Sequence, residues 1–268
     1  MRSIVISLLG LCMVPESALA YRTFADLPEL AEAAGEPVAW QSFPIALEVV
    51  FDDRAPVSTA ETTAALDRAS ELWNDAMCTE DAFEPSVATD LAGSNDGYNT
   101  VQWVHASWSL LGTADVVAVT QPIYEVMGGR YVLVEADVFL NADTMIWTAD
   151  LIEHLDGVLA HELGHVLGLA HPCEIDGEGG APLCESGARA DTLMHPLYAP
   201  ARAAVASDDQ DGACFLYAEM PRAVPPMMGP KSGCTIAGFA LAGSSRFSSF
   251  ALGAALVLLA HRRGQRAA

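Results

Sequence analysis

The sequence predicts an α+β domain, because strand-like and helix-like stretches follow one another in the order strand, helix, strands, helix, loop, helix. Ile45–Asp52 (IALEVVFD) alternates and is rich in β-branched side chains, which is typical of a strand. Ser58–Ala76 instead carries an apolar stripe at helical spacing, formed by Leu66, Ala69, Leu72, Trp73 and Ala76. A length of 268 residues and a hydrophobic content of 51% suit one domain with its own core and two terminal segments.

The first helix carries an N-terminal capping signal, since Ser58 is followed three residues later by Glu61. The pair Gly128 and Gly129 indicates a hairpin turn between two strands. Further strands are expected at Val101–Trp108, Asp115–Thr120 and Arg130–Leu140.

The second half of the chain is expected to be mainly helical. A helix is predicted at Asp150–Leu167, with Asp150 or Thr148 as its N-cap. Residues 172–192 are rich in glycine and acidic side chains and predict a loop. Ser207–Glu219 is expected to close the domain as a last helix.

Residues 161–171 read His-Glu-Leu-Gly-His-Val-Leu-Gly-Leu-Ala-His and place three imidazoles at the spacing of a zinc site. His161 and His165 are four residues apart and therefore share a helix face. Two neutral imidazoles so placed can both reach one Zn²⁺ at about 2.0–2.1 Å. Gly168 can end the helix in a left-handed conformation, and the turn then brings His171 back as the third ligand.

Glu162 follows the first ligand, so it lies beside the metal without needing to bind it. That is the position of a general base for a zinc-bound water, and the fourth coordination position stays open for water and substrate. His154 lies two turns before His161 and is expected at the surface rather than on the metal. The sequence therefore predicts one catalytic Zn²⁺ with Glu162 as the catalytic base.

This HExxHxxGxxH motif resembles that of the metzincin metallopeptidases. In that clan a methionine turn lies beneath the zinc. Residues 191–196 (DTLMHP) resemble its matrixin version, which implies that Met194 forms an apolar floor under the imidazoles. The pattern makes His195 a neighbour of the turn and not a ligand. Tyr198 is a candidate hydrogen-bond donor to a transition-state oxyanion, although it lies four residues after Met194 and not two.

The resemblance to matrixins extends over residues 40–218. Ala136–Asn141 (ADVFLN), followed by Trp147, resembles the strand and tryptophan that precede the active-site helix in that group. Ser207–Gly212 (SDDQDG) resembles the start of its C-terminal helix. The resemblance implies a zincin-like domain with a twisted mixed β-sheet, an active-site helix and a C-terminal helix.

A peptide substrate of such a domain would lie extended along an edge strand, for which residues 115–120 are the candidate. Two features of animal matrix metalloproteinases are missing. No cysteine-switch propeptide is found, and Tyr21–Trp40 is short for a propeptide, though it could cover the cleft. The His/Asp cluster for a structural zinc is also lacking between residues 95 and 135, so a second zinc is not supported.

The charge of the chain is strongly acidic, with a formal net charge of −22. This argues against nucleic acid and anionic membrane surfaces as partners. It favours either solubility outside the cell or a preference for basic peptide segments. Acidic loops could also hold Ca²⁺ through oxygen ligands. The candidates are Asp208, Asp209, Asp211 and the loop Asn95-Asp96-Gly97, none with EF-hand spacing, and Asp208 could instead cap a helix.

Five cysteines lie beyond the N-terminal apolar segment. Cys173 and Cys184 bracket the loop after the third histidine and are predicted to pair. Cys78 and Cys214 would then pair and link the first helix to the last. The alternative is a free thiol that ligates zinc. Cys234 is left over and belongs to the C-terminal tail.

The two ends of the chain predict export. Residues 1–20 have the charge, apolar run and Ala-Leu-Ala site of a signal peptide, with lipoprotein processing at Cys12 as an alternative. A catalytic domain at residues 21–220 would precede a proline-rich linker at 221–233 and a hydrophobic tail at 234–268.

This tail resembles a MYXO-CTERM sorting tail, with a Gly-Cys, a short hydrophobic helix and terminal arginines. The resemblance implies processing near Cys234 and attachment at the bacterial cell surface or outer membrane. Its apolar run Phe247–Ala260 is shorter than the about 20 residues of a stable span. A permanent single-span anchor is the alternative.

Together these features predict a secreted, surface-anchored zinc endopeptidase that acts on protein or peptide substrates as a monomer. Its only contact with a membrane would be through the tail. The alternatives are a non-catalytic binding or adhesion module on the same fold and a protein whose zinc is structural. An intact Glu162 argues against the first, and an open fourth ligand position argues against the second.

Overall fold

The computed structural model describes residues 21–28, 30, 36–79, 81–84, 86–90, 93–175, 181–184, 191–200, 203–218 and 256–260. The predicted signal peptide, the proline-rich linker and Cys234 lie outside these ranges. Among the described residues, no helix is long and apolar enough to cross a membrane.

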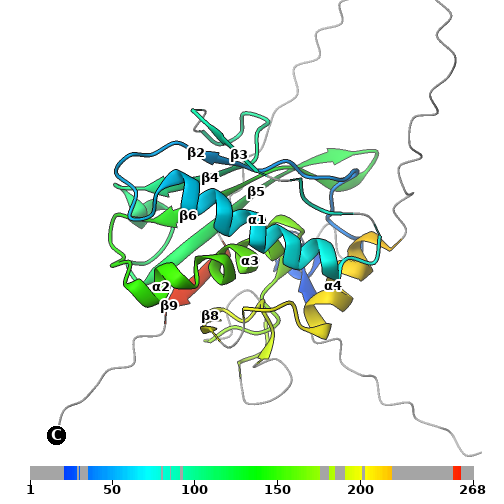
Figure 1. Ribbon diagram of the computed structural model, residues 1–268. Helices are drawn as coiled ribbons and strands as arrows, with labels where there is room; N and C mark the ends of the chain where they lie inside the picture. Colours follow the sequence, from blue (N-terminus) through cyan, green and yellow to red (C-terminus); the bar gives the residue numbers. More distant parts are fainter. Residues whose placement is uncertain are drawn as a thin grey trace, which may run out of the picture.

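A mixed β-sheet with helices packed across one face forms the domain (Figure 1). The strand order is β3-β2-β4-β6-β5-β9-β8. Only β5 runs antiparallel to its two neighbours, β6 and β9, and the other neighbouring pairs of this sheet are parallel. The strands are β2 (Glu48–Val50), β3 (Val87–Thr89), β4 (Thr100–Val104), β5 (Val116–Met127), β6 (Arg130–Asn141), β8 (Leu197–Tyr198) and β9 (Leu256–Ala260). A separate antiparallel pair joins β1 (Arg22–Thr23) to β7 (Leu169–Ala170). The predicted α+β class and mixed sheet are therefore confirmed.

The helices are α1 (Thr59–Ala76), α2 (Ala149–Glu153), α3 (Leu155–Val166) and α4 (Ser207–Tyr217), with short 3-10 turns at Phe24–Asp26 and Trp108–Leu110. Ser58 caps α1, and Glu61 completes the predicted capping box. The main core lies between α1, α3 and the inner face of the sheet, and Trp73 at its centre donates its indole N–H to the Ala160 carbonyl oxygen. The burial of apolar side chains in this core holds α3 in place.

The helix predicted at Asp150–Leu167 is interrupted, and α2 and α3 meet at His154, whose backbone is not helical (φ −109°, ψ 24°). The His154 ring nitrogen Nδ1 bonds the Asp150 carbonyl oxygen, which is the acceptor that the His154 backbone N–H would use in a continuous helix. Thr148, not Asp150, is the N-cap, since its hydroxyl accepts from the Leu151 N–H.

Two of the predicted strands end at other residues in the structure than the sequence suggested. The strand expected at Val101–Trp108 stops at Val104, and Trp108 is instead the first residue of a short 3-10 helix. There the Trp108 indole donates to the Thr113 carbonyl oxygen and its backbone N–H to Asp143, so the buried ring has partners that a straight strand would not offer. The strand expected at residues 115–120 instead continues to Met127, where Gly128 and Gly129, both with positive φ, make the predicted hairpin turn.

Residues 115–120 are not the edge of the sheet, which corrects the prediction. The backbone of β9 pairs antiparallel with β5, from Val116 opposite Leu259 to Thr120 opposite Leu256. The tail residues 256–260 thus form a strand where a short hydrophobic helix was expected. A free strand edge offers unpaired N–H and C=O groups, and an apolar segment rich in leucine can satisfy them by adding a strand.

Candidate metal centre

Helix α3 presents His161, His165 and Glu162 from a fully buried position. Every residue of α3 from Gly157 to Val166 is buried, between α1 on one side and β5 on the other. A helix that is apolar all round belongs to a core. The polar groups of the HELGH segment therefore lie inside the protein and need partners there.

The three imidazoles converge on one point. The Nε2 atom of His171 lies 3.2 Å from the Nε2 atoms of both His161 and His165. All three side chains are no more than 2% exposed. Histidines four residues apart on α3 and a third that returns after the Gly168 turn thus meet as the sequence predicted.

The other ring nitrogens fix how these imidazoles are protonated. The Nδ1 atom of His161 lies 2.6 Å from the Leu193 carbonyl oxygen, and that of His165 lies 2.8 Å from the Leu169 carbonyl oxygen. A carbonyl oxygen only accepts, so each Nδ1 carries the hydrogen and each Nε2 keeps its lone pair. The Nδ1 atom of His171 lies 2.8 Å from the Glu174 carboxylate oxygen Oε1. Three lone pairs therefore point toward one another.

The arrangement fits a metal ion. Three buried lone pairs at this distance repel one another unless a cation lies between them. Ligands at about 2.0–2.1 Å in tetrahedral geometry would lie about 3.4 Å apart, close to the separations found here. Burial, followed by the neighbouring histidines of the group, lowers the pKa of His161 and His165 well below the usual value, so both stay neutral. The group could bind a metal ion, and neutral imidazoles suit several transition metals.

Glu162 is buried beside the histidines and is held by a residue that the sequence did not single out. Its Oε2 atom accepts from the Thr120 hydroxyl on β5 at 2.6 Å. Its Oε1 atom is buried and has no hydrogen-bond partner among the described residues. Burial raises the pKa of Glu162 to about 8, against the opposing effect of the Thr120 hydrogen bond.

Two glycines shape this site. Gly168 has φ +94°, as predicted for the residue that ends the helix, and its N–H donates to the His165 carbonyl oxygen. Gly164 lies within α3 where a Cβ atom would be 2.2 Å from the Met194 sulfur and 2.9 Å from Trp73. Met194 is buried against this bare stretch of helix, so the predicted apolar floor lies next to the helix that bears His161 and His165.

The turn at Met194 is tied to α4 by Asp209. The Asp209 carboxylate accepts from the backbone N–H groups of Leu193, Met194 and Ala206. Asp209 thus caps α4 and holds the turn whose Leu193 carbonyl oxygen meets His161. Its oxygens are committed to these N–H groups, and Asp208 is not the capping residue.

The segment after His171 is also fixed from several sides. Cys173 and Cys184 form a disulfide, and Cys78 and Cys214 form a second one between the end of α1 and α4. Both predicted pairings are confirmed, and the alternative of a free thiol on the metal is wrong for these four residues. The disulfides indicate an extracellular or secreted protein.

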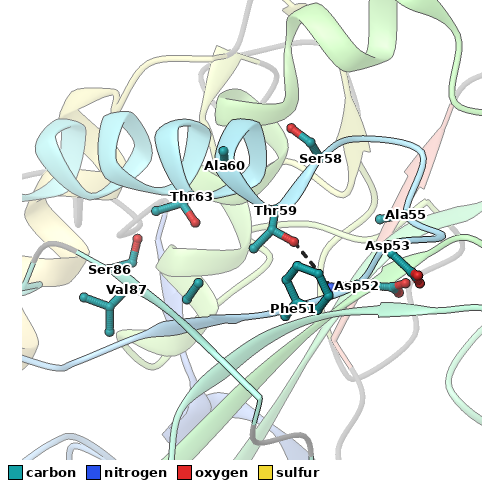
Figure 2. A pocket seen from close by; sticks show the side chains of 11 residues that line it. Phe51, Asp52, Asp53, Ala55, Ser58, Thr59, Ala60, Thr63, Ser86 and Val87 are labelled. Carbon is teal, nitrogen blue, oxygen red and sulfur yellow. Dashed lines mark hydrogen bonds between the residues drawn. The ribbon is translucent and has the colours of Figure 1, made fainter.

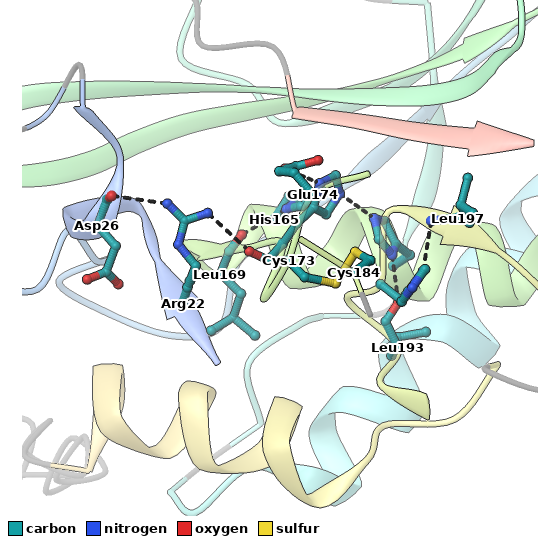
Figure 3. A network of polar contacts seen from close by, with 12 residues as sticks. Arg22, Asp26, His165, Leu169, Cys173, Glu174, Cys184, Leu193 and Leu197 are labelled. Carbon is teal, nitrogen blue, oxygen red and sulfur yellow. Dashed lines mark hydrogen bonds and ion pairs between the residues drawn. A yellow bond between two sulfur atoms is a disulfide. The ribbon is translucent and has the colours of Figure 1, made fainter. Parts of the chain in front are cut away.

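The N-terminal residues support the third histidine, which the sequence did not suggest. Arg22 donates to the carbonyl oxygens of His171 and Asp26, and β1 pairs with β7 directly before His171 (Figure 3). Glu174, whose carboxylate contacts the His171 ring, also donates its backbone N–H to the Pro182 carbonyl oxygen. No local pattern marks Arg22 as a partner of His171, because the two residues are 149 positions apart.

The remaining candidates do not join the histidine group. His154 bonds the Asp150 carbonyl oxygen, and His195 accepts from the Leu197 N–H beside the Cys173–Cys184 disulfide. Tyr198 lies in β8, and its side chain is outside the described residues. A separate groove between the start of α1 and β3 is lined by Phe51, Thr59 and Val87 among others, and none of its lining residues belongs to the centre (Figure 2).

Compared with protein-family models and with curated proteins, the chain matches no family model and no curated protein.

Proposed function

We propose that the protein is a zinc-dependent endopeptidase of the metzincin type, exported and attached to the cell surface by its C-terminal tail. The observation that supports this most is the set of three convergent Nε2 atoms next to a buried carboxylate. A structural zinc site is usually closed by four protein ligands. Here the described residues supply three, and the fourth group of the motif, Glu162, is bonded to Thr120 instead.

When bound, a zinc ion supplies a water of lowered pKa and polarises the scissile carbonyl group. The chain's own residues then provide the proton transfer. Thr120 holds Glu162 Oε2, which leaves Oε1 as the free acceptor for the proton of the attacking water. The same carboxyl group can deliver that proton to the leaving amine. His161 and His165 are held by backbone carbonyl oxygens, so they keep their orientation during the reaction.

An extended peptide is the substrate that this fold favours. The backbone of β9 pairs with β5 in antiparallel register, and this supports β5 as a strand along which an extended peptide could lie. Thr120 lies in that register and also contacts Glu162, so a segment on β5 runs past the proposed base.

A binding or adhesion module without catalysis is the second candidate. It is favoured by one observation: Glu162 and the three histidines are buried, with β9 lying between β5 and β8. A hydrolase must open this site to its substrate, whereas a module that only binds through another surface need not. Access to the site therefore separates the two candidates.

The test is a Glu162→Gln variant of the zinc-loaded protein, with Glu153→Gln on the exposed face of α2 as the matched control. Gln keeps the shape and a hydrogen-bond acceptor for Thr120 but cannot take a proton. We expect one zinc per chain in all three proteins, by elemental analysis. Cleavage of a denatured protein should fall at least about a hundredfold in Glu162→Gln alone. Equal cleavage by wild type and Glu162→Gln would reject the proposed base.

A further inference from the structure

Two buried carboxylates lie on the face of the sheet opposite to the histidines. Glu135 and Asp137 are two residues apart on β6, so their side chains point to the same face. Ala136, which lies between them, and Val138, which follows them, belong to the main core under α1 and α3. Glu135 and Asp137 therefore point to the outer face, yet their exposed fractions are only 2% and 0%.

The loop that begins at Gly93 covers the first carboxylate. The backbone N–H groups of Asn95 and Gly97 donate to the two oxygens of Glu135. This places the loop Asn95-Asp96-Gly97, which the sequence marked for its acidic and turn-forming residues, directly over β6. The Glu135 carboxylate is thus held in one orientation beneath the loop.

The second carboxylate has one oxygen without a donor. Asp137 Oδ1 accepts from the Thr100 N–H at 3.0 Å and from the Thr100 hydroxyl at 2.6 Å. Asp137 Oδ2 is buried and has no hydrogen-bond partner among the described residues. The groups that interact with Asp137 include the Glu135 carboxyl, which carries the same charge. A buried carboxylate in this position is costly unless something positive or a proton joins it.

The surrounding groups supply oxygens and no cationic side chain. Within the described part of the chain, no Arg, Lys or His forms an ion pair with Glu135 or Asp137. Gln121 lies opposite Asp137 in the register of β5 and β6, and its Oε1 atom is 3.4 Å from the Ser94 hydroxyl of the covering loop. The Gln102 side chain donates to the Gly93 carbonyl oxygen and to the Thr100 hydroxyl, each at 2.6 Å, and so joins the loop to the residue that binds Asp137.

We propose that Glu135 and Asp137 form a site for one calcium ion that fastens the 93–97 loop to the outer face of the sheet. Ca²⁺ takes six to eight oxygen ligands in flexible geometry, so two carboxylates, nearby amide or carbonyl oxygens and water suffice. Among the described residues, the contacts of Glu135 and Asp137 bring no imidazole or thiol to the site, which differs in this from the histidine centre, whose donors suit transition metals. One divalent ion would neutralise the two buried charges.

A shared proton is the competing occupant, and pH separates the two. Burial, followed by the neighbouring Glu135, raises the pKa of Asp137 to about 7. Glu135 on β6 is the titratable group that interacts with Asp137. Asp96 belongs to the loop that covers Glu135, and Thr100 and Gln121 carry no charge. A raised pKa means that the folded state binds the proton more tightly than the unfolded chain. Without a cation, stability is therefore present at low pH and is lost as the pH rises from about 4 through about 7.

The experiment measures melting temperature with CaCl₂ on the full chain loaded with zinc, at pH 6 and pH 8. We expect millimolar CaCl₂ to raise the melting temperature by about 5 °C at pH 8 and by less at pH 6, where the proton competes. Equilibrium dialysis with radioactive calcium should find one ion per chain in the wild type. Asp137→Asn and Glu135→Gln should each abolish the calcium-dependent shift and the bound ion.

Asp211→Asn and Glu71→Gln, which remove the same charges at exposed positions, are the matched controls and should keep the full shift. Loss of the shift in Asp211→Asn alone would place the ion at the start of α4 and overturn the proposal. So would a wild type that binds no calcium at millimolar concentration. Since none of these measurements uses peptidase activity, their failure is independent of the proposed function.

Discussion

Two adjacent residues of β5, Thr120 and Gln121, mark the two chemically different faces of this sheet. Thr120 points to the helices and bonds Glu162 next to three imidazoles. Gln121 points outward and lies opposite Asp137, in the carboxylate pair under the 93–97 loop. Both faces bury polar groups, but the imidazoles are neutral and need a cation only at their converging Nε2 atoms, whereas the paired carboxylates carry charge and need a counter-charge or a proton. Because side chains alternate along a strand, a single strand can contribute to an imidazole cluster on one face of the sheet and to a carboxylate cluster on the other.

The largest effect is expected for Gly164→Ala, which tests whether the two faces of the sheet are independent of each other. A methyl group there would meet the Met194 sulfur and Trp73, so overpacking should lower the free energy of unfolding by about 1–3 kcal/mol, even though Ala favours helix over Gly. Denaturant unfolding measures this, and zinc content should fall with it. The calcium-dependent shift should persist, because the outer face is untouched.

The double variant Gly164→Ala with Met194→Ala is the control for that interpretation. Removing the sulfur gives the new methyl group space, so the pair should be less destabilised than the sum of the single variants. Strict additivity would show that Met194 does not limit the space beside α3.

A smaller effect is expected for Thr120→Val, which removes the hydroxyl that positions Glu162. We expect kcat to fall about tenfold at unchanged KM and zinc content, since one hydrogen bond to a buried carboxylate is lost. Thr120→Ser should restore most of the rate. A loss in Thr120→Val that Thr120→Ser does not rescue would assign Thr120 to packing.

The smallest expected effect concerns the tail strand. A chain that ends at residue 255 lacks β9 and leaves the backbone edge of β5 free for substrate. We expect its kcat/KM on a denatured protein to rise up to about tenfold, since a competing segment reduces activity by the fraction of time that it occupies the edge. A chain that ends at residue 220 should match it. No change in either would mean that β9 does not compete with substrate.

Local pattern was sufficient for the elements whose partners lie nearby in sequence. The α1 cap at Ser58, the turn at Gly128 and Gly129, and the left-handed Gly168 follow from the preferences of single residues. The convergence of His161, His165 and His171 also follows from helical spacing and one turn. Pattern failed at His154, whose ring bonds the backbone where the helix is interrupted, and at Trp108, whose indole bonds the backbone in a 3-10 helix where a strand was predicted.

The sequence by itself determined the mixed α+β class, the two disulfide pairings and the convergence of the three histidines, because each rests on short-range spacing or on simple pairing within one domain. Only the tertiary structure decided that Thr120 holds Glu162, that Asp209 holds the Met194 turn and that β9 covers β5. It also decided that Glu135 and Asp137 are buried together under the 93–97 loop. These contacts join residues from 15 to more than 100 positions apart, and such pairs are brought together by the packing of the whole core and not by any local preference.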